Sequence, residues 1–217
     1  MKRTTLISFA AGSIATAGLA FLIAAGPEHK HHDSHDGMDK VTEPEMNEMM
    51  EMSEAEIMAA MMKISTPNEH HAKLSESVGE WTAHASFIMD PTQPPMESEG
   101  SMTVTSVLGG RYIMSEFKMH FMGQPFEGLG LHGYDIAHEQ YISTWADTMS
   151  TKILYMTGNE DDDGNMIMLG TATTPMGDNP MKIVSKHHED GTWSDKFFDQ
   201  MPDGSWYNSG TITYTRK

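Results

Sequence analysis

Cysteine is absent from the 217 residues, and its absence excludes several kinds of site at once. Without a thiol there is no disulfide, no iron–sulfur cluster, no cysteine nucleophile and no lipid attached at a cysteine. The sequence also lacks a glycine-rich phosphate loop, a Gly-x-Ser-x-Gly elbow and a paired His-Glu helix, which are typical of nucleotide-binding proteins, many hydrolases and zinc proteases. No residue therefore receives a catalytic role from the sequence.

Positive charge is also scarce. There are 14 Lys and Arg residues against 31 Asp and Glu residues, which gives a formal net charge of −17. Such a surface repels nucleic acid and anionic lipid headgroups, but it is compatible with collecting cations. We therefore expect no nucleic-acid partner, and the length beyond a leader fits one domain.

The N-terminus has the pattern of an export signal. Lys2 and Arg3 are followed by residues 4–27, which carry no charge. A short positive start and an apolar run are typical of secretory leaders, so residues 1–26 are expected to direct the protein to the periplasm or cell envelope. The run is also long enough to span a bilayer. Cleavage, after Gly26 or Ala20, is favoured over a retained anchor, which would be the one membrane contact expected.

Residues 27–41 form a polar segment that is expected to be disordered, because it has many charges and no apolar periodicity. It contains His29, His31, His32 and His35, and a Met-rich stretch follows. Imidazole and thioether groups suit copper, and zinc would accept the histidines. The spacing fixes no geometry, so copper or zinc buffering is a second hypothesis, and no other cofactor is expected.

Residues 42–78 are expected to form two helices. Thr42-Glu43-Pro44-Glu45 is a capping box that opens a Met-rich helix running to Ile64. A second box, Thr66-Pro67-Asn68-Glu69, opens a shorter helix that ends before Gly79.

Residues 79–217 read as ten short strands separated by turns rich in Gly, Pro and Asp. Hairpins in series give an antiparallel meander, and we expect an all-β fold in which the meander closes into a calycin-like barrel after the two helices. The expected strands are Glu80–Asp90, Glu97–Leu108, Arg111–Phe121, Phe126–Ile136, Gln140–Met149, Lys152–Asn159, Met166–Thr173, Met181–His188, Thr192–Gln200 and Ser205–Arg216.

Several ordered segments of this chain carry a family resemblance. They are Pro67–His70, Gly79–Trp81, Leu108–Tyr112, Phe121–Gly128, Gly133–Asp135, Ser143–Thr151 and Ile212–Arg216. Over about residues 45–217 the chain resembles the bacterial family catalogued as domain of unknown function 1579. That family has no established activity, so the resemblance supports the barrel and implies no reaction.

The two ends of the barrel domain are similar to those of the lipocalin and fatty-acid-binding superfamily. Gly79 and Trp81 form a Gly-x-Trp that opens the first strand, and Arg216 lies on the last. The resemblance implies that Arg216 packs across Trp81 at the closed end of the barrel, as a cation–π contact worth on the order of 1 kcal/mol.

Trp145, Asp147 and Met149 are spaced two residues apart, so they share one face of their strand. If that face is the lumen, the Asp147 carboxylate needs a cationic or hydrogen-bonding partner, which could be Arg111, Lys118 or a ligand. A structural role in a turn or an ion pair is the more common reason for such an acid.

Other side chains are candidates for a partly polar lumen that binds a ligand, although large side chains could simply fill a barrel. They are Tyr112, Met114 and Glu116 on one strand, and His132 and Tyr134 on the next.

The leading hypothesis is an exported protein that binds a small apolar or amphipathic molecule in the lumen, with the two helices as a lid. An enzyme using a lumen carboxylate, such as Asp147 with His132, is an alternative. A haem protein like the ten-stranded nitrobindins is disfavoured, because their proximal His lies near the chain end and residues 189–217 contain no histidine. The sequence gives neither the ligand nor the oligomeric state.

Overall fold

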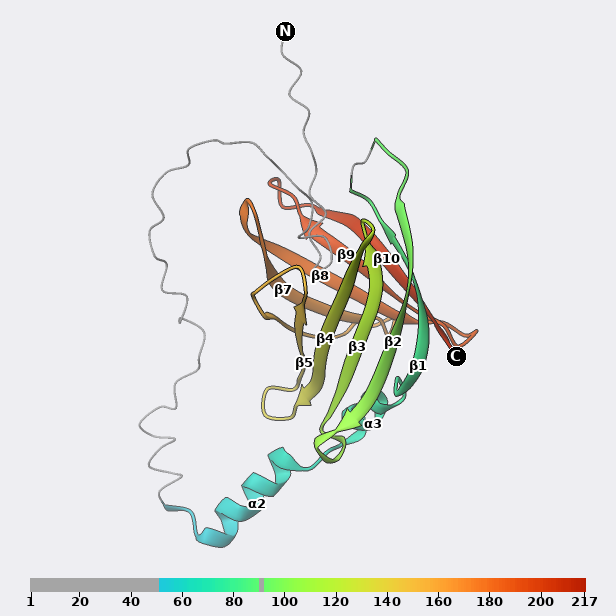
Figure 1. Ribbon diagram of the computed structural model, residues 1–217. Coiled ribbons are helices and arrows are strands. Elements are labelled where there is room, and N and C mark those ends of the chain that lie inside the picture. The colour runs from blue at the N-terminus through green and yellow to red at the C-terminus, as the bar shows by residue number, and fades with distance from the viewer. Residues whose placement is uncertain (1–50, 90–91) are drawn as a thin grey trace. The chain divides into compact units, whose positions relative to one another are not determined.

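A computed structural model of the protein describes residues 51–89 and 92–217 (Figure 1). The described chain divides into two units at Thr66 and Pro67, and each is described by itself. The leader, the polar segment with its four histidines and the first part of the Met-rich helix lie outside the described residues. No described helix combines the length and apolar character needed to cross a membrane.

Helix α2 (Glu54–Ser65) begins later than the sequence predicts. Met52 and Ser53 are not helical, so the prediction of one uninterrupted helix from Thr42 to Ile64 is wrong. The cause is a capping box that the sequence analysis did not identify, formed by Ser53 and Glu56. The Ser53 backbone N–H donates to Glu56 Oε2 at 2.8 Å, and the Glu56 N–H donates to Ser53 Oγ. These bonds satisfy helix-end donors and start a new helix.

The N-cap of helix α3 (Glu69–Ser75) is Asn68, whereas the sequence predicted Thr66. Thr66 instead ends α2, where its hydroxyl donates to the Met62 carbonyl at 2.6 Å. The side chain of Asn68 accepts a hydrogen bond from the His70 N–H, so α3 begins two residues later than expected.

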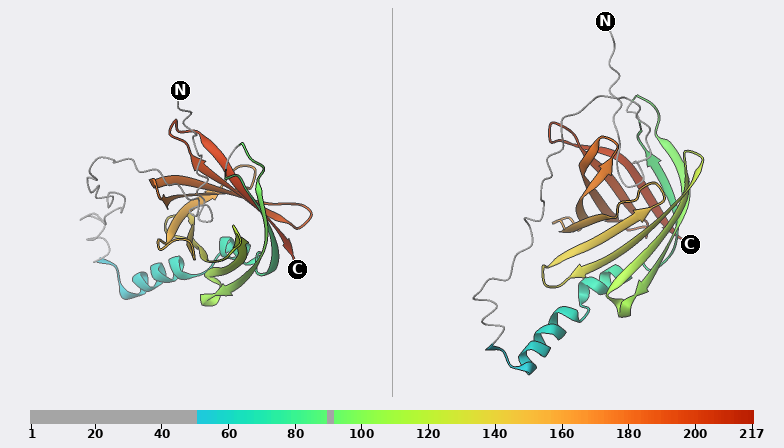
Figure 2. Two further views of the ribbon diagram at one scale, coloured as in Figure 1. Left: turned by 45° about the horizontal axis from the view of Figure 1, so that its top comes forward. Right: turned by 60° about the vertical axis from the view of Figure 1, so that its left-hand side comes forward.

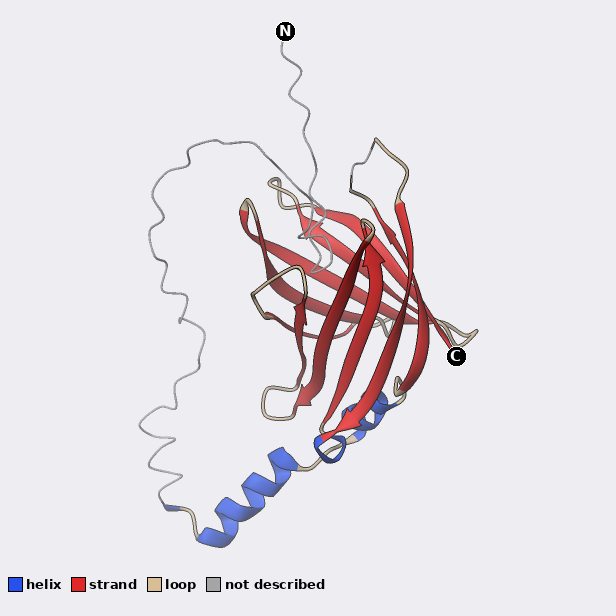
Figure 3. Ribbon diagram, viewed as in Figure 1, coloured by secondary structure: helices blue, strands red, loops and turns tan. Residues whose placement is uncertain are grey.

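Ten antiparallel strands follow in a meander (Figure 3). They close into a ring in the order β1-β10-β9-β8-β7-β6-β5-β4-β3-β2. Figure 2 shows the curved sheet from two further sides. The predicted fold class is confirmed. The strands are β1 (Gly79–Phe87), β2 (Met96–Val107), β3 (Tyr112–Phe121), β4 (Gln124–Asp135), β5 (Gln140–Asp147), β6 (Leu154–Glu160), β7 (Met166–Thr174), β8 (Gly177–His187), β9 (Trp193–Gln200) and β10 (Trp206–Arg216), with a short 3-10 turn, η2 (Leu108–Gly110), between β2 and β3.

Strand β1 closes the ring because it pairs on both sides. Trp81 lies opposite Met102 of β2 and opposite Arg216 of β10. Along β1 every second side chain from Trp81 to Phe87 is buried, which is the alternation expected of a strand with one face toward a core.

Two hairpins are tighter than the sequence predicts. Met122 and Gly123 have φ values of 50° and 77°, so the turn needs only these two residues. Pro125 therefore lies inside β4, opposite His120, and not in the turn. Pro180 likewise lies inside β8.

The two ends of the barrel differ. At one end, α3 contacts η2, β3 and β4, and we call this the α3 end (Figure 1). At the opposite end, which we call the far end, phenylalanine rings fill the interior. The Phe87 ring lies 6.0 Å from Phe121 and 6.2 Å from Phe197 between centroids, and the buried Phe126 ring lies 6.2 Å from Phe117. The far end is therefore a packed core.

Candidate functional site

The interior toward the α3 end holds a cavity of about 400 Å³. Its wall is mainly apolar and includes Met102, Val104, Ile113, Phe117, Ile183 and Ile212. The exposed residues along its lining lie at the α3 end and mark its mouth. They are Lys73, Glu76, Glu160, Asp163, Gly164, Lys186 and His187.

Helix α3 is held on the rim of this cavity by contacts from several strands. The His70 ring stacks on Tyr134 with centroids 3.9 Å apart, and its Nδ1 is 3.0 Å from the Tyr141 hydroxyl. Lys73 forms an ion pair with Glu160 of β6. Tyr134, predicted to bind ligand, therefore anchors α3 and is not among the residues that line the cavity.

Arg216 lies across Trp81, as the superfamily resemblance implies. Its guanidinium carbon is 4.3 Å from the ring centroid, and the group donates to the carbonyls of Val78 at 2.9 Å and Glu76 at 2.8 Å. Gly79 has a φ of 146°, a conformation that residues with a Cβ rarely adopt, so glycine is favoured beside Arg216. The contact lies at the α3 end, beside residues of the cavity mouth and not at the packed end of the barrel.

His132 presents a polar group to the cavity from β4. Its Nε2 is 2.8 Å from Ser115 Oγ and its Nδ1 is 2.9 Å from Ser143 Oγ, and all three residues border the cavity. A Cβ on Gly130 would lie 2.5 Å from both His132 Nε2 and Ser115 Oγ, so this glycine leaves room for the bond. Burial lowers the pKa of His132 to about 4. The ring is therefore neutral at pH 7, with one nitrogen donating and the other accepting.

Asp195 presents the second polar group, from the inward face of β9. Its carboxylate accepts hydrogen bonds from the side chains of Ser185, Trp193 and Tyr214. Burial raises the pKa of Asp195, while these bonds and the charge of His187 oppose the rise. Burial and the neighbouring Asp195 hold the pKa of Tyr214 well above its usual range, so its hydroxyl keeps its proton and donates.

His132 and Asp195 lie on opposite walls of the barrel. Strands β4 and β9 are five positions apart in both directions around the ring of ten. The cavity is thus an apolar hollow with a neutral hydrogen-bonding group on one wall and a carboxyl group on the other.

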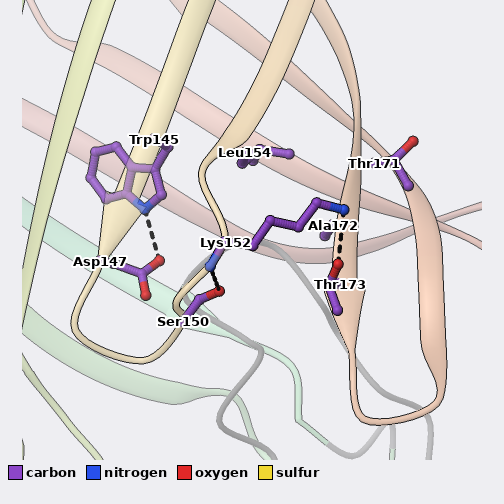
Figure 4. Close-up of a pocket in the computed structure, with 8 residues that line it drawn as sticks. All are labelled: Trp145, Asp147, Ser150, Lys152, Leu154, Thr171, Ala172 and Thr173. Carbon is purple, nitrogen blue, oxygen red and sulfur yellow. Dashed lines mark hydrogen bonds between the residues drawn. The ribbon is translucent and has the colours of Figure 1, made fainter. Parts of the chain in front are cut away.

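Asp147, the acid that the sequence singled out, has a different environment (Figure 4). It accepts from Trp145 Nε1 at 2.9 Å and from the Met149 N–H at 2.9 Å, and a further backbone bond comes from Ser150. Burial raises the pKa of Asp147 and these bonds lower it. The carboxylate borders a hollow of only about 20 Å³, which is space for one water molecule. Asp147 therefore closes the turn after β5, the structural role that was the alternative.

Of the two residues predicted to share a face with Asp147, Trp145 lines the large cavity and Met149 does not. Met149 supplies a backbone donor and packs partly against the core. A Cβ on Gly128 would lie 2.1 Å from the Trp145 ring, so this glycine makes the space that the indole occupies.

The face predicted for β3 is wrong. Ile113, Ser115 and Phe117 line the cavity, so Tyr112, Met114 and Glu116 lie on the opposite face. All of these positions alternate, and alternation alone does not say which set points inward.

The cations suggested as partners of Asp147 are occupied elsewhere. Arg111 donates to the Leu108 carbonyl at 3.3 Å and is exposed. Lys118 lies 3.6 Å from Glu127 on the outer surface.

The suggested pair of Asp147 with His132 does not form, because each side chain has other partners. Sequence reasoning also missed Asp195, which follows Trp193 at the same spacing as Asp147 follows Trp145. An acid between the inward Trp193 and Phe197 was the signal that could have found it. No sequence signal could have found Ser115 and Ser143, because their role depends on the hydrogen bonds that each forms with His132 in the folded protein.

Metal binding by the N-terminal histidines falls outside the described residues. Within residues 51–89 and 92–217, no group of three or more His, Asp or Glu side chains is arranged to hold a metal ion.

A closed ten-stranded antiparallel barrel with an internal hollow defines a calycin-like barrel protein. Residues 66–216 match the family described as "Protein of unknown function (DUF1579)", and the chain belongs to that family. No curated protein matches it. One similar solved structure is that of Rv2717c from M. tuberculosis, which is 14% identical with a TM-score of 0.46, the match covering 67% of this chain and 96% of that one.

Proposed function

We propose that this protein binds a small, largely apolar molecule in the barrel cavity. The observation that supports the proposal is the volume of about 400 Å³ in one continuous hollow with exposed residues at its mouth. Sites for small ligands commonly measure 300–1,000 Å³ and combine apolar walls with a few polar groups. The apolar wall, His132 and Asp195 provide that combination.

Binding is better supported than hydrolysis at the serine–histidine contact. Ser115 and His132 are close enough to serve as nucleophile and base. In a catalytic triad, however, the second histidine nitrogen donates to a carboxylate, and here it faces Ser143. A pKa of about 4 also makes His132 a weak base at neutral pH.

The proposed location is outside the cytoplasm, and its support is the uncharged run after Lys2 and Arg3. Fractionation of the native host would place the protein in the envelope or periplasm, whereas recovery in the cytoplasm would contradict this part of the proposal.

The binding proposal is tested by native mass spectrometry of full-length protein purified from its own host. The wild type is expected to carry an organic molecule that is released on unfolding. Val104→Phe adds bulk to the cavity wall and should remove the extra mass. Thr105→Phe, on the other face of the same strand, should keep it.

The emptied protein should also bind phenylnaphthylamine, a neutral apolar dye, with a rise in fluorescence that Val104→Phe removes. Failure of the wild type both to carry a molecule and to bind the dye would overturn the proposal. Copper or zinc in place of an organic molecule would support the metal-buffering hypothesis instead.

A further inference from the structure

Among the acids that line the cavity, Asp195 is the one that is not exposed. Every charged residue at the mouth is exposed, while Asp195 lies deeper, between Trp193 and Phe197 on β9. Among the described residues, none of the ion pairs involves Asp195. The charge of His187, an exposed residue at the mouth, acts on Asp195 without forming an ion pair, so a cationic group inside the cavity would give the carboxylate a closer partner.

The hydrogen bonds to Asp195 favour its anionic form and oppose the burial that raises its pKa. Ser185, Trp193 and Tyr214 all point donors at the carboxylate. Because Asp195 lines the cavity, a molecule inside it can reach the carboxylate.

The surroundings of Asp195 also favour a cation. Trp193 and Phe197 flank it two residues away on either side, and both line the cavity. Aromatic faces attract ammonium groups, and the attraction is stronger where water is excluded. The charges at the mouth nearly balance, because Lys73 and Lys186 accompany the acids Glu76, Glu160 and Asp163. The whole chain has a formal charge of −17, so the long-range field draws cations in.

The wall opposite Asp195, which carries His132, places a second requirement on the ligand. The His132 ring is neutral, and each of its nitrogens is paired with a serine hydroxyl. This wall therefore suits a ligand that carries either an uncharged polar group or no polar group at this point. The walls between the two are apolar, with side chains such as Ile113 and Ile212.

We propose that the ligand of this cavity is an amphipathic organic amine, whose ammonium group pairs with Asp195 and whose apolar body lies against the aromatic and aliphatic wall. This inference rests on the proposed function, because it specifies the ligand class of the same cavity.

The experiment measures how well decylamine, decanol and decanoate displace phenylnaphthylamine from emptied full-length protein at pH 7. The three have matched alkyl tails and carry a positive, a neutral and a negative head. A hydrogen bond to a charged group is worth about 1.5–3 kcal/mol, so decylamine should bind about ten- to a hundredfold more tightly than decanol. Decanoate should bind most weakly.

Asp195→Asn should remove the preference for decylamine while decanol binding and dye binding persist. Asp178→Asn is the control, because it removes the same formal charge at the exposed start of β8, where Asp178 pairs with Lys152. That variant should keep the preference.

The outcomes separate the two proposals. If the dye does not bind at all, the proposed function fails. If the dye binds but decylamine is no better than decanol, or decanoate binds best, the amine inference is overturned and the cavity remains. If Asp178→Asn weakens the preference as much as Asp195→Asn, the selectivity comes from net charge and the assignment to Asp195 is overturned.

Discussion

The chain contains two Trp-x-Asp sequences on inward strand faces, and they behave differently. Trp145 and Asp147 end β5 at the far end of the barrel, while Trp193 and Asp195 begin β9 at the α3 end. Asp147 is held by its own turn, whereas Asp195 faces a cavity of about 400 Å³. The same local spacing therefore yields a structural acid where the interior is filled and an accessible acid where it is hollow.

The wider contrast is between the packed far end and the hollow α3 end. The far end is closely packed, so truncating a side chain there leaves a cavity whose walls lose van der Waals contacts, and the free energy of unfolding falls. A side chain that already faces a hollow has fewer contacts to lose. The two ends should therefore respond differently to the same truncation.

The largest effect is expected from Phe121→Ala. Phe121 is 1% exposed in the far-end core, so its truncation should lower the free energy of unfolding by about 3–5 kcal/mol. Met168→Ala, on the cavity wall, should lie near the lower limit for such changes, at about 2 kcal/mol. Urea unfolding measures both. Equal losses at the two sites would show that the α3 end is as tightly packed as the far end.

Acid should destabilise the α3 end through His132. The unfolded His132 takes up its proton near pH 6.5 and the folded one near pH 4, so the unfolded state binds more protons between these values and stability falls as pH falls. The loss amounts to up to about 3 kcal/mol across this window.

The measurement is urea unfolding of the wild type and of His132→Gln, which keeps a donor and an acceptor but does not titrate in this range. The stability advantage of the wild type should shrink as the pH drops from 6.5 toward 4. A constant difference would mean that the pKa of His132 is the same in the folded and the unfolded protein.

A smaller loss is expected from Asp147→Ala, which leaves the Trp145 and Met149 N–H groups without their acceptor. The free energy of unfolding should fall by about 2 kcal/mol. Asp147→Asn keeps an acceptor oxygen and should lose less. Both variants should retain the preference for decylamine that Asp195→Asn abolishes, and loss of that preference in Asp147→Asn would erase the distinction between the two acids.

Much of the architecture could be predicted from the sequence. Period-two alternation from Trp81 to Phe87, and turns such as Asp161–Gly164, define strands and hairpins through local physics. Local signals were also misread where two of them competed, as at Ser53, whose capping box interrupts a helix that the Met-rich pattern would continue.

The amino-acid sequence by itself determined the acidic charge, the lack of thiol chemistry, the strands and their order in a meander. Only the tertiary structure decided which face of β3 points inward, which Trp-x-Asp faces a hollow, and that His132 sits between two serines from neighbouring strands. The physical reason is that alternation is a local property with two equivalent solutions, whereas space inside a barrel is set by side chains from all ten strands at once.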